Sequence, residues 1–374
     1  MARQNKAIVI GSTGVSGAAL VHKLEHEGFE VWGVSRGNTG SPTGARTIAV
    51  DLAGESDLRE ITELAPTHVF YTAWKRHPTE AENIAVNGMM VRRALEAAGK
   101  GGAVQHVALV TGLKQYIGPP ELQGTIPTPD TPFKEDAPRL PIKMFYYAQE
   151  DELFRAAETY AFAWSVHRAH TIVGHAVGNA MNIAATLGAQ AAICREEGRP
   201  FVFPGSRVRW DGLGDMTDAD LLADHMHWAA TTPGVGNEAY NVVNGDVFRW
   251  RTMWPLIAEM LGVQAADFPE ERMPLTKQMV DSEDTWRRIA QQDNLVEPDV
   301  NRVASWWHTD GDLGRWIEML ADMSKSRRAG YTGYIATDDS FRKTFEQYRE
   351  SHVLPRIRAQ RPHLVPSDRV APGY

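Results

Sequence analysis

The stretch that decides the fold is residues 7–17, AIVIGSTGVSG. Its first part is apolar and rich in β-branched residues, which predicts a buried strand over 7–11. Gly11, Gly14 and Gly17 then follow at three-residue spacing, where the strand must turn into a helix predicted over 15–27. Glycine permits the tight turn and lets backbone N–H groups and the helix N-terminus approach a pyrophosphate. The stretch therefore predicts a dinucleotide site, with an ordinary glycine-rich turn as the alternative.

The rest of the first half repeats this alternation of short apolar runs and helical periods. It is typical of the α/β class, here a Rossmann-like doubly wound parallel sheet that binds its ligand at the carboxyl ends of the strands. We expect this domain to span 1–173. Further strands are predicted over 30–35, 47–51, 68–73, 106–111 and 165–170, and further helices over 79–98 and 147–160.

The second half is richer in Trp, Met and helical periods, with one clear strand over 239–243. We expect 174–360 to form a smaller, mostly helical substrate-binding lobe over the strand ends, and 361–374 a loose tail. Seven of the 21 prolines fall within 118–141, which excludes a helix or a central strand there. We expect that segment to be a long surface loop beside the active site.

Composition excludes several classes of protein. Of 374 residues, 43% are hydrophobic and 23% charged, as in globular proteins. The formal charge is 39 − 47 = −8, which argues against a nucleic-acid partner. The only cysteine, Cys194, excludes an intramolecular disulfide and a thiolate metal cluster and favours a reducing cytoplasm. No run is long and apolar enough for a signal peptide or a membrane helix, so no membrane partner is expected.

The end of the second strand indicates which dinucleotide binds. NAD-binding proteins usually carry an acidic residue there for the ribose 2′-OH, but this chain reads GVSRG, with Ser35 and Arg36. Arg36 suits a 2′-phosphate, which predicts NADP(H); the alternative is that Arg36 only stacks on adenine. Asp51 and Leu52, after the third strand, are expected beside the adenine.

Short-chain dehydrogenases usually carry Tyr-x-x-x-Lys on one helix, where the lysine lowers the pKa of the tyrosine and binds the ribose. Here FYYAQED places Glu150 four residues after Tyr146 and Asp151 four after Tyr147, so that lysine is missing. Another lysine, Lys114, lies in TGLKQYIGP after the fifth strand, at the sheet edge where the nicotinamide is expected.

With these residues the sequence resembles the progesterone 5β-reductase and iridoid synthase (PRISE) family of atypical, extended short-chain dehydrogenases/reductases. The resemblance runs from about residue 5 to 355 and rests on GSTGVSG, HVFYTAW, TGLKQYIGP, FYYAQED, SVHR, WDGLGDMTDADLLADH and NVVNGDVFRW. It implies that Lys114 and Tyr146 are the catalytic pair. It also implies NADPH-dependent reduction of the carbon–carbon double bond of an enone or enal.

The chemistry suits the two residues. Hydride added to the β-carbon pushes negative charge onto the carbonyl oxygen, and a Tyr146 hydrogen bond would stabilise that enolate. Lys114 would supply positive potential, orient the phenol and hold the ribose. The substrate pocket is expected at Trp74, Tyr146, Met181 and His308. The cofactor is expected at Gly11, Thr13, Gly14, Val15, Gly17, Ser35, Arg36, Asp51, Leu52, Thr72, Ala73, Trp74, Thr111, Gly112, Lys114, Tyr146 and Thr171.

Some positions depart from the family pattern. Where the family reads S-V-H-R-P-G-N, this chain has SVHRAHT, with Ala169, His170 and Thr171 in the loop expected to touch nicotinamide and substrate. His308 replaces an aromatic residue, so we expect a more polar pocket than that of a steroid or terpenoid reductase. A metal is not expected, because His225 and His227 are two apart on a predicted helix and point in different directions.

Two other functions remain open at this stage. One is an NADPH-dependent carbonyl reductase on the same scaffold, since the pair could also protonate an alkoxide. The other is a non-catalytic NADP-sensing protein, which would need neither Tyr146 nor Lys114. The expected partner is a small-molecule enone or enal, and a homodimer stays open.

Overall fold

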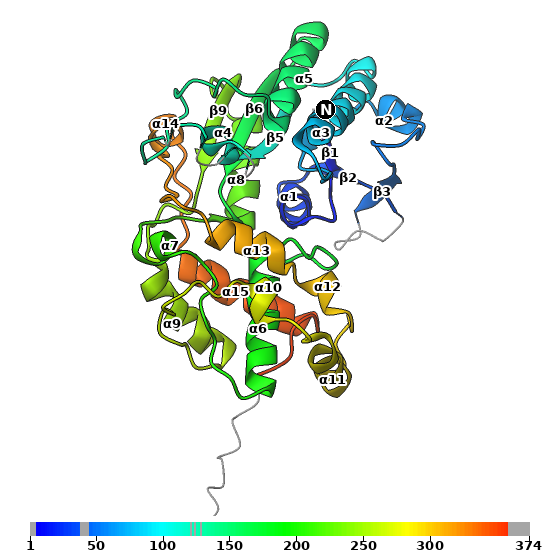
Figure 1. Cartoon of the computed structure of the whole chain (residues 1–374). Helices are drawn as coiled ribbons and strands as arrows, with labels where there is room; N and C mark the ends of the chain where they lie inside the picture. Colours follow the sequence, from blue (N-terminus) through cyan, green and yellow to red (C-terminus); the bar gives the residue numbers. More distant parts are fainter. Residues whose placement is uncertain (1–4, 38–44, 120–121, 123–124, 128, 358–374) are drawn as a thin grey trace, which may run out of the picture.

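A parallel sheet of seven strands forms the upper half of the molecule in Figure 1. The computed structural model describes residues 5–37, 45–119, 122, 125–127 and 129–357. The strands follow one another across the sheet in the order β3-β2-β1-β4-β5-β6-β9, and β7 and β8 form a separate parallel pair. The strands are β1 (Lys6–Ile10), β2 (Glu30–Ser35), β3 (Arg46–Ala49), β4 (His68–Tyr71), β5 (His106–Gly112), β6 (Ala163–Ala169), β7 (Ile172–Val173), β8 (Thr217–Asp218) and β9 (Glu238–Val242).

Helices cover both faces of the sheet. On one face α3 (Glu80–Lys100) packs along α5 (Phe145–Tyr160), and on the other α1 (Val15–His26) packs along α8 (Ala219–Thr231). Each pair buries its own apolar cluster against the strands, which is why all four residues of the central β4 are buried. A strand that is buried on both faces has a continuous run of apolar residues in its sequence. The apolar runs used above to predict the strands have this cause.

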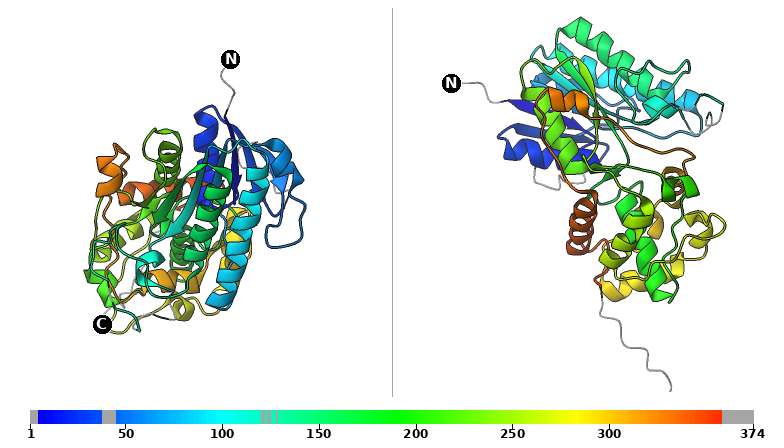
Figure 2. Two further views of the ribbon diagram at one scale, coloured as in Figure 1. Left: turned by 90° about the horizontal axis from the view of Figure 1, so that it is seen from above. Right: turned by 90° about the vertical axis from the view of Figure 1, so that its left-hand side faces the viewer.

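A mostly helical lobe lies below the sheet, as the right-hand view of Figure 2 shows. Its core is aromatic, with Trp254 stacked on Phe201 at 4.0 Å between ring centroids. The remaining helices are α2 (Arg59–Leu64), α4 (Lys114–Ile117), α6 (Ile183–Glu196), α7 (Arg207–Asp211), α9 (Trp250–Leu261), α10 (Leu275–Gln278), α11 (Glu283–Asp293), α12 (Val300–Val303), α13 (Trp306–Leu313), α14 (Ser324–Arg328) and α15 (Thr337–Glu350). The chain does not stay in this lobe, because α8 and β9 return to the sheet.

The predicted fold class is confirmed, and the expected strand over 239–243 is β9, which pairs in parallel with β6. The pair β7 and β8 was not predicted, because two residues per strand are too few to show a period. The domain boundary at 173 falls at the end of β7 and stays a prediction, and the expected tail at 361–374 lies outside the described residues.

The proline-rich segment 118–141 carries no named helix or strand in its described residues. Phe133 is buried and pairs with Ala321, and Asn241 at the outer strand β9 donates to the Phe133 carbonyl oxygen at 2.9 Å. The described residues around Phe133 therefore pack against β9. Leu140 near the end of the segment donates its N–H to the Tyr147 hydroxyl on α5, and the expected place of the segment beside the active site stays a prediction. No helix in the described ranges is both long and apolar enough to cross a membrane.

Candidate active site

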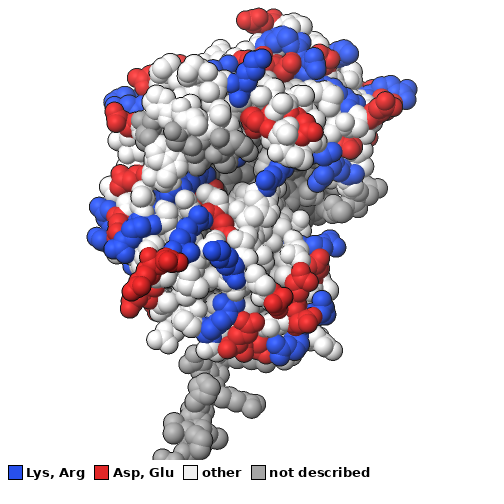
Figure 3. Space-filling view, in the orientation of Figure 1, with Lys and Arg blue, Asp and Glu red and all other residues white. Residues whose placement is uncertain are grey.

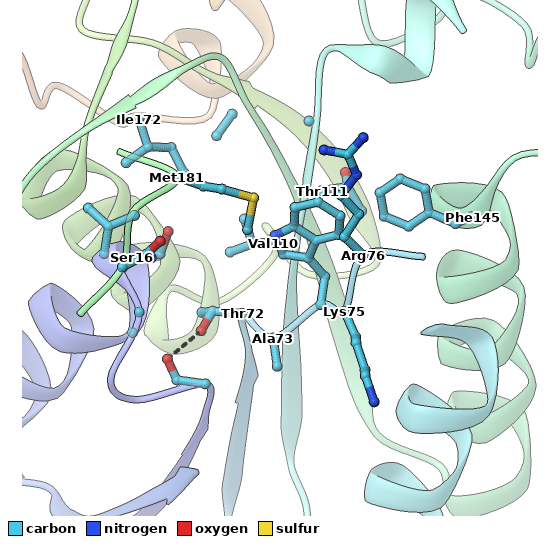
Figure 4. A pocket seen from close by; sticks show the side chains of 18 of the residues that line it. Ser16, Thr72, Ala73, Lys75, Arg76, Val110, Thr111, Phe145, Ile172 and Met181 are labelled. Carbon is cyan, nitrogen blue, oxygen red and sulfur yellow. Dashed lines mark hydrogen bonds between the residues drawn. The ribbon is translucent and has the colours of Figure 1, made fainter. Parts of the chain in front are cut away.

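A cavity of about 630 Å³ lies at the carboxyl ends of β1, β2, β4, β5 and β6. Segment 177–183 and helix α13 of the lobe supply its other wall. In Figure 3 the surface is hollowed between the sheet and the lobe, and Figure 4 shows side chains from both converging on one space. Every cofactor and substrate residue named above lines this cavity. The structure therefore brings them together, and their contacts with ligands stay predictions.

The glycine turn fits a dinucleotide. Gly11 has φ +88°, which L side chains rarely adopt, and a Cβ on Gly17 would lie 2.1 Å from the Gly11 carbonyl oxygen. Gly14 caps α1 without a side-chain hydrogen bond, and the first turn of α1 holds no acidic residue. The positive N-terminal end of α1 therefore borders the cavity with no acidic side chain in its first turn, as a pyrophosphate site requires.

The end of β2 provides a basic position beside the turn. Arg36 is exposed and lines the cavity, whereas the Ser35 hydroxyl donates to the Gly37 carbonyl oxygen at 2.9 Å. Asp51 accepts a hydrogen bond from the Ala53 N–H at 3.0 Å and so shapes the turn after β3. The Ser35 hydroxyl is already bonded, so Arg36 is the residue at the end of β2 that offers a positive charge to the cavity. A cation at this position suits a phosphate on the adenosine ribose.

The segment after β4 forms the floor of the cavity. The Thr72 hydroxyl donates to the Ile10 carbonyl oxygen at 2.9 Å, which ties β4 to the glycine turn (Figure 4). The segment ends at Thr79, which caps α3 in a capping box with Glu82. Between them the exposed Trp74 stacks on Phe145 of α5 at 5.8 Å between ring centroids.

Tyr146 reaches the cavity from the first turn of α5. Its hydroxyl lies beside Gly112 at the end of β5, where a Cβ would come within 2.9 Å of that oxygen. Glycine is therefore needed at 112 for the phenol to approach the strand end. Burial raises the pKa of Tyr146, and the Arg315 guanidinium opposes this rise, so the phenol is protonated at neutral pH. No hydrogen-bond partner of this hydroxyl is found within the described ranges.

Lys114 begins the short helix α4, directly after β5. Its ammonium lies 5.9 Å from the centre of the Phe145 ring, and its charge contributes to lowering the pKa of His308. The lysine therefore stands beside the aromatic side of the cavity and adds positive potential there.

Glu150, at the usual lysine position, does not line the cavity. It is 2% exposed, accepts a hydrogen bond from Arg139 at 2.7 Å and lies 3.6 Å from Arg168. Arg168 in turn donates to the Tyr116 hydroxyl, which donates to Asn241 at 2.6 Å. These side chains form one polar network that joins α5, β6, α4 and β9.

Sequence reasoning missed a charged pair in the cavity wall. Arg315 donates to Asp312 at 2.6 Å, and the second Asp312 oxygen accepts from the Thr171 hydroxyl at 3.1 Å. Burial opposes ionisation of Asp312, but the neighbouring Arg315 and His308 hold the pKa of that carboxyl well below its usual range. Through Asp312, this ion pair connects the end of α13 to Thr171 in the loop after β6. Nothing local in the sequence signals it, because Thr171 and Asp312 are 141 residues apart.

Two further contacts complete the lobe side of the cavity. The guanidinium carbon of Arg76 lies 3.6 Å from the centre of the Trp307 ring and joins the segment after β4 to α13. His308 lines the cavity with its Nδ1 buried and, among the described residues, without a hydrogen-bond partner. Burial lowers the pKa of His308, as do the charges of Lys114 and Arg315, so the ring is neutral at pH 7.

The two histidines of α8 face different neighbours. His225 shares a 3.0 Å hydrogen bond with His167 of β6, whereas His227 packs against Phe29. They point in different directions, as expected from their spacing. Within the described ranges, no group of three or more His, Cys, Asp or Glu side chains could hold a metal ion.

Comparisons with known proteins agree with this geometry. Residues 51–355 match the model of the PRISE-like Rossmann-fold domain. An (S)-8-oxocitronellyl enol synthase of Camptotheca acuminata is 38% identical over 370 residues, covering 94% of both chains. A 3-oxo-Delta(4,5)-steroid 5-beta-reductase of Arabidopsis thaliana is 36% identical over 371 residues, with the same coverage.

Solved structures share the fold at low sequence identity. The UDP-glucose 4-epimerase of Thermotoga maritima has a TM-score of 0.65 at 17% identity, covering 92% of this chain and 99% of its own. The Bordetella bronchiseptica enzyme WbmH, solved with NAD+, has a TM-score of 0.62 at 17% identity, covering 93% and 99%. These structures thus share the Rossmann fold of the extended short-chain dehydrogenase/reductase type. Within that fold the chain belongs to the PRISE-like family.

Proposed function

We propose that the protein is an NADPH-dependent reductase of the carbon–carbon double bond in α,β-unsaturated carbonyl compounds. The observation that carries this proposal is that Tyr146, with no partner for its hydroxyl in the described ranges, lines the same cavity as the glycine turn and Lys114. The relatives support the chemistry, since they are named as an enol synthase and a steroid 5-beta-reductase. The competing activity, carbonyl reduction, is an outcome of the test below.

NADPH, when bound, supplies a hydride for the β-carbon of the substrate. The phenol of Tyr146 donates a hydrogen bond to the carbonyl oxygen, where negative charge develops as the enolate forms. Because burial keeps this phenol protonated, it is ready to donate before the reaction begins. A preorganised donor in a site screened from water stabilises the developing charge without reorganising.

The charges around the phenol support the same step. Lys114 and Arg315 both line the cavity, and each is positively charged at neutral pH. Arg315 is held in place by Asp312, so its charge stays fixed near Tyr146. The charge of Arg315 favours an oxyanion at this end of the cavity, and the negative charges of Asp312 and Glu80 oppose it.

The test of the proposal is product identity with a simple enone. Incubation with 2-cyclohexenone and 4-deuterated NADPH is expected to give the saturated ketone with deuterium on the β-carbon. Deuterium on the carbinol carbon of an allylic alcohol would replace the proposal by carbonyl reduction. Cofactor binding without turnover of any enone or ketone would favour the sensing function.

The cofactor preference gives a separate prediction. Arg36 is the cation at the end of β2, so titration is expected to show tighter binding of NADPH than of NADH. The change Arg36→Ala should remove about 1–3 kcal/mol of that preference, the range for a hydrogen bond to a charged group. Arg59→Ala is a suitable control, because Arg59 is exposed and pairs with Asp57 away from the cavity. Equal affinity of the unchanged protein for both cofactors would contradict the assignment.

His308, on the lobe side of the cavity, gives a prediction about which substrates the protein prefers. His308 presents a neutral ring to the cavity, so an apolar substrate group there leaves the ring nitrogens unpaired. His308→Phe is expected to raise kcat/KM for a bulky apolar enone relative to 2-cyclohexenone, by about 1–2 kcal/mol in transition-state free energy. Specificity ratios that stay the same within error would mean that His308 does not contact the substrate.

A further inference from the structure

A second titratable pair, His170 and Asp215, lies at the cavity and has no role in the steps above. The Nδ1 of His170 lies 2.7 Å from an Asp215 oxygen, and the two side chains are 2% and 1% exposed. The second Asp215 oxygen accepts a hydrogen bond from the Ala321 N–H at 2.7 Å. The backbone N–H of His170 donates to the Thr217 hydroxyl at 2.9 Å. The imidazole is thus held by both its ring and its backbone.

This arrangement determines which ring nitrogen is basic. The Asp215 oxygen beside Nδ1 accepts a hydrogen bond from the Nδ1–H, so Nε2 carries the lone pair. No hydrogen bond of Nε2 is found within the described ranges, and His170 lines the cavity. A histidine oriented by a buried carboxylate with its second nitrogen toward a ligand cavity has the geometry of a general acid or base.

The pair lies on the same side of the cavity as the phenol. A Cβ on Gly112 would lie 2.9 Å from the Tyr146 hydroxyl and 3.1 Å from the carbonyl oxygen of Ala169, the residue before His170. Asp312 and Arg315 act on both His170 and Tyr146 electrostatically. The phenol and the imidazole therefore border one reaction space.

Reduction of an enone needs a proton at the α-carbon as well as a hydride at the β-carbon. We infer that His170 delivers this proton from Nε2 and that Asp215 positions it. This inference rests on the proposed function and extends it, because the phenol of Tyr146 is engaged with the oxygen.

The step balances as follows. The Nε2–H bond of protonated His170 breaks, and a C–H bond forms at the α-carbon from the electron pair of the enolate double bond. The carbonyl double bond is restored, and the Tyr146 hydrogen bond returns to a neutral oxygen. The imidazole is left neutral and takes a new proton from solvent. Each turnover therefore consumes one proton from solvent, which ends on the α-carbon.

The charges facing His170 determine the pH dependence. Burial lowers the pKa of His170, Asp215 raises it, and the cations Arg209 and Arg315 lower it. An enolate in the cavity adds a negative charge beside the ring and raises the pKa again. Since the acid must be protonated to act, kcat is expected to fall as pH rises, with a slope of one proton.

The experiment uses 2-methyl-2-cyclohexenone in deuterium oxide, because its α-carbon becomes a stereocentre. The unchanged enzyme is expected to give a single α-deuterated enantiomer of 2-methylcyclohexanone, since a fixed acid reaches one face. His170→Gln should give both enantiomers and lower kcat about 100-fold, the low end for general acid catalysis. The fall of kcat at high pH should also be absent in this variant. His175→Gln is the matched control, because His175 bonds Ser351 outside the cavity and should change neither result.

A single enantiomer from His170→Gln would overturn the inference, whatever the rate of the variant. A measurement on the unchanged protein without cofactor covers the case of a variant that does not fold. Ring ¹⁵N shifts of His170 at neutral pH should show a protonated Nδ1 and a bare Nε2, and the opposite tautomer would overturn the inference. If the unchanged enzyme places no hydride on the β-carbon, the proposed function fails instead.

Discussion

Replacing Tyr146 by Phe is expected to lower kcat/KM for enone reduction by about 2.7–4 kcal/mol, or 100- to 1,000-fold, and to leave measurable activity. This is the loss typical of removing one oxyanion donor, because the enolate oxygen needs stabilisation but no proton. The substitution removes only a hydroxyl without a partner among the described residues. The folded state should therefore be little affected, and thermal unfolding of the variant can confirm this.

Tyr147→Phe provides the matched control on the same helix. The Tyr147 hydroxyl donates to the Gln115 carbonyl oxygen and accepts from the Leu140 N–H, both at 2.9 Å, and it does not line the cavity. Its loss should reduce stability and leave kcat/KM within a few-fold. In carbonyl reduction the alkoxide needs a proton in the same step as the hydride. Near-complete loss of turnover in Tyr146→Phe would therefore favour that activity.

The first half of the fold could be predicted because its signals are local. The strand over 7–11, the glycine turn and the helix after it lie in about twenty consecutive residues, and each has a period or a required φ. The same locality explains why the cofactor side of the cavity was found. Residues at the carboxyl ends of parallel strands meet at one edge of the sheet wherever they lie in the chain.

The lobe side could be predicted only in part. His308 was identified from a motif, but Asp312 and Arg315, a turn and two turns beyond it, were not. Their role depends on Thr171, which only the folded chain brings near. The pairing of His170 with Asp215 is hidden in the same way, because 45 residues separate them. Contacts between distant segments leave no period in the sequence, so side-chain pairs of this kind emerge only from the structure.

A buried row of histidines predicts that the protein loses stability in mild acid. His106 shares a hydrogen bond with Ser165 at 2.8 Å, Ser165 with His167 at 2.9 Å, and His167 with His225 at 3.0 Å. Burial lowers the pKa of His106 and of His225 to about 3 and that of His167 well below its usual value. The aromatic rings of α8 and β9 surround His225, and the charge that acts on it is the cation Arg327.

The direction of the effect follows from these shifts. Each of these histidines has a low pKa in the folded protein and the usual pKa of about 6.5 in the unfolded chain. Its contribution to stability is therefore complete above pH of about 6.5. That contribution is lost as pH falls from 6.5 toward 3, because the unfolded chain binds protons that the folded chain excludes. Between pH 7 and pH 5 the loss is about 2 kcal/mol for each buried histidine. Three of them approach the whole stability of an ordinary domain, about 5–15 kcal/mol.

Urea unfolding at pH 7, 6 and 5 measures this loss, and we expect these three histidines to contribute about 6 kcal/mol to the fall in the free energy of unfolding over that range. His106→Gln should reduce the pH dependence by about one third, because the Gln amide can take the place of Nε2 beside the Ser165 hydroxyl without titrating. His26→Gln is the control, since the His26 side chain is 84% exposed and should leave the dependence unchanged. An unfolding free energy that stays constant from pH 7 to pH 5 would mean that the buried row accepts protons without unfolding, as it would if water entered beside His225.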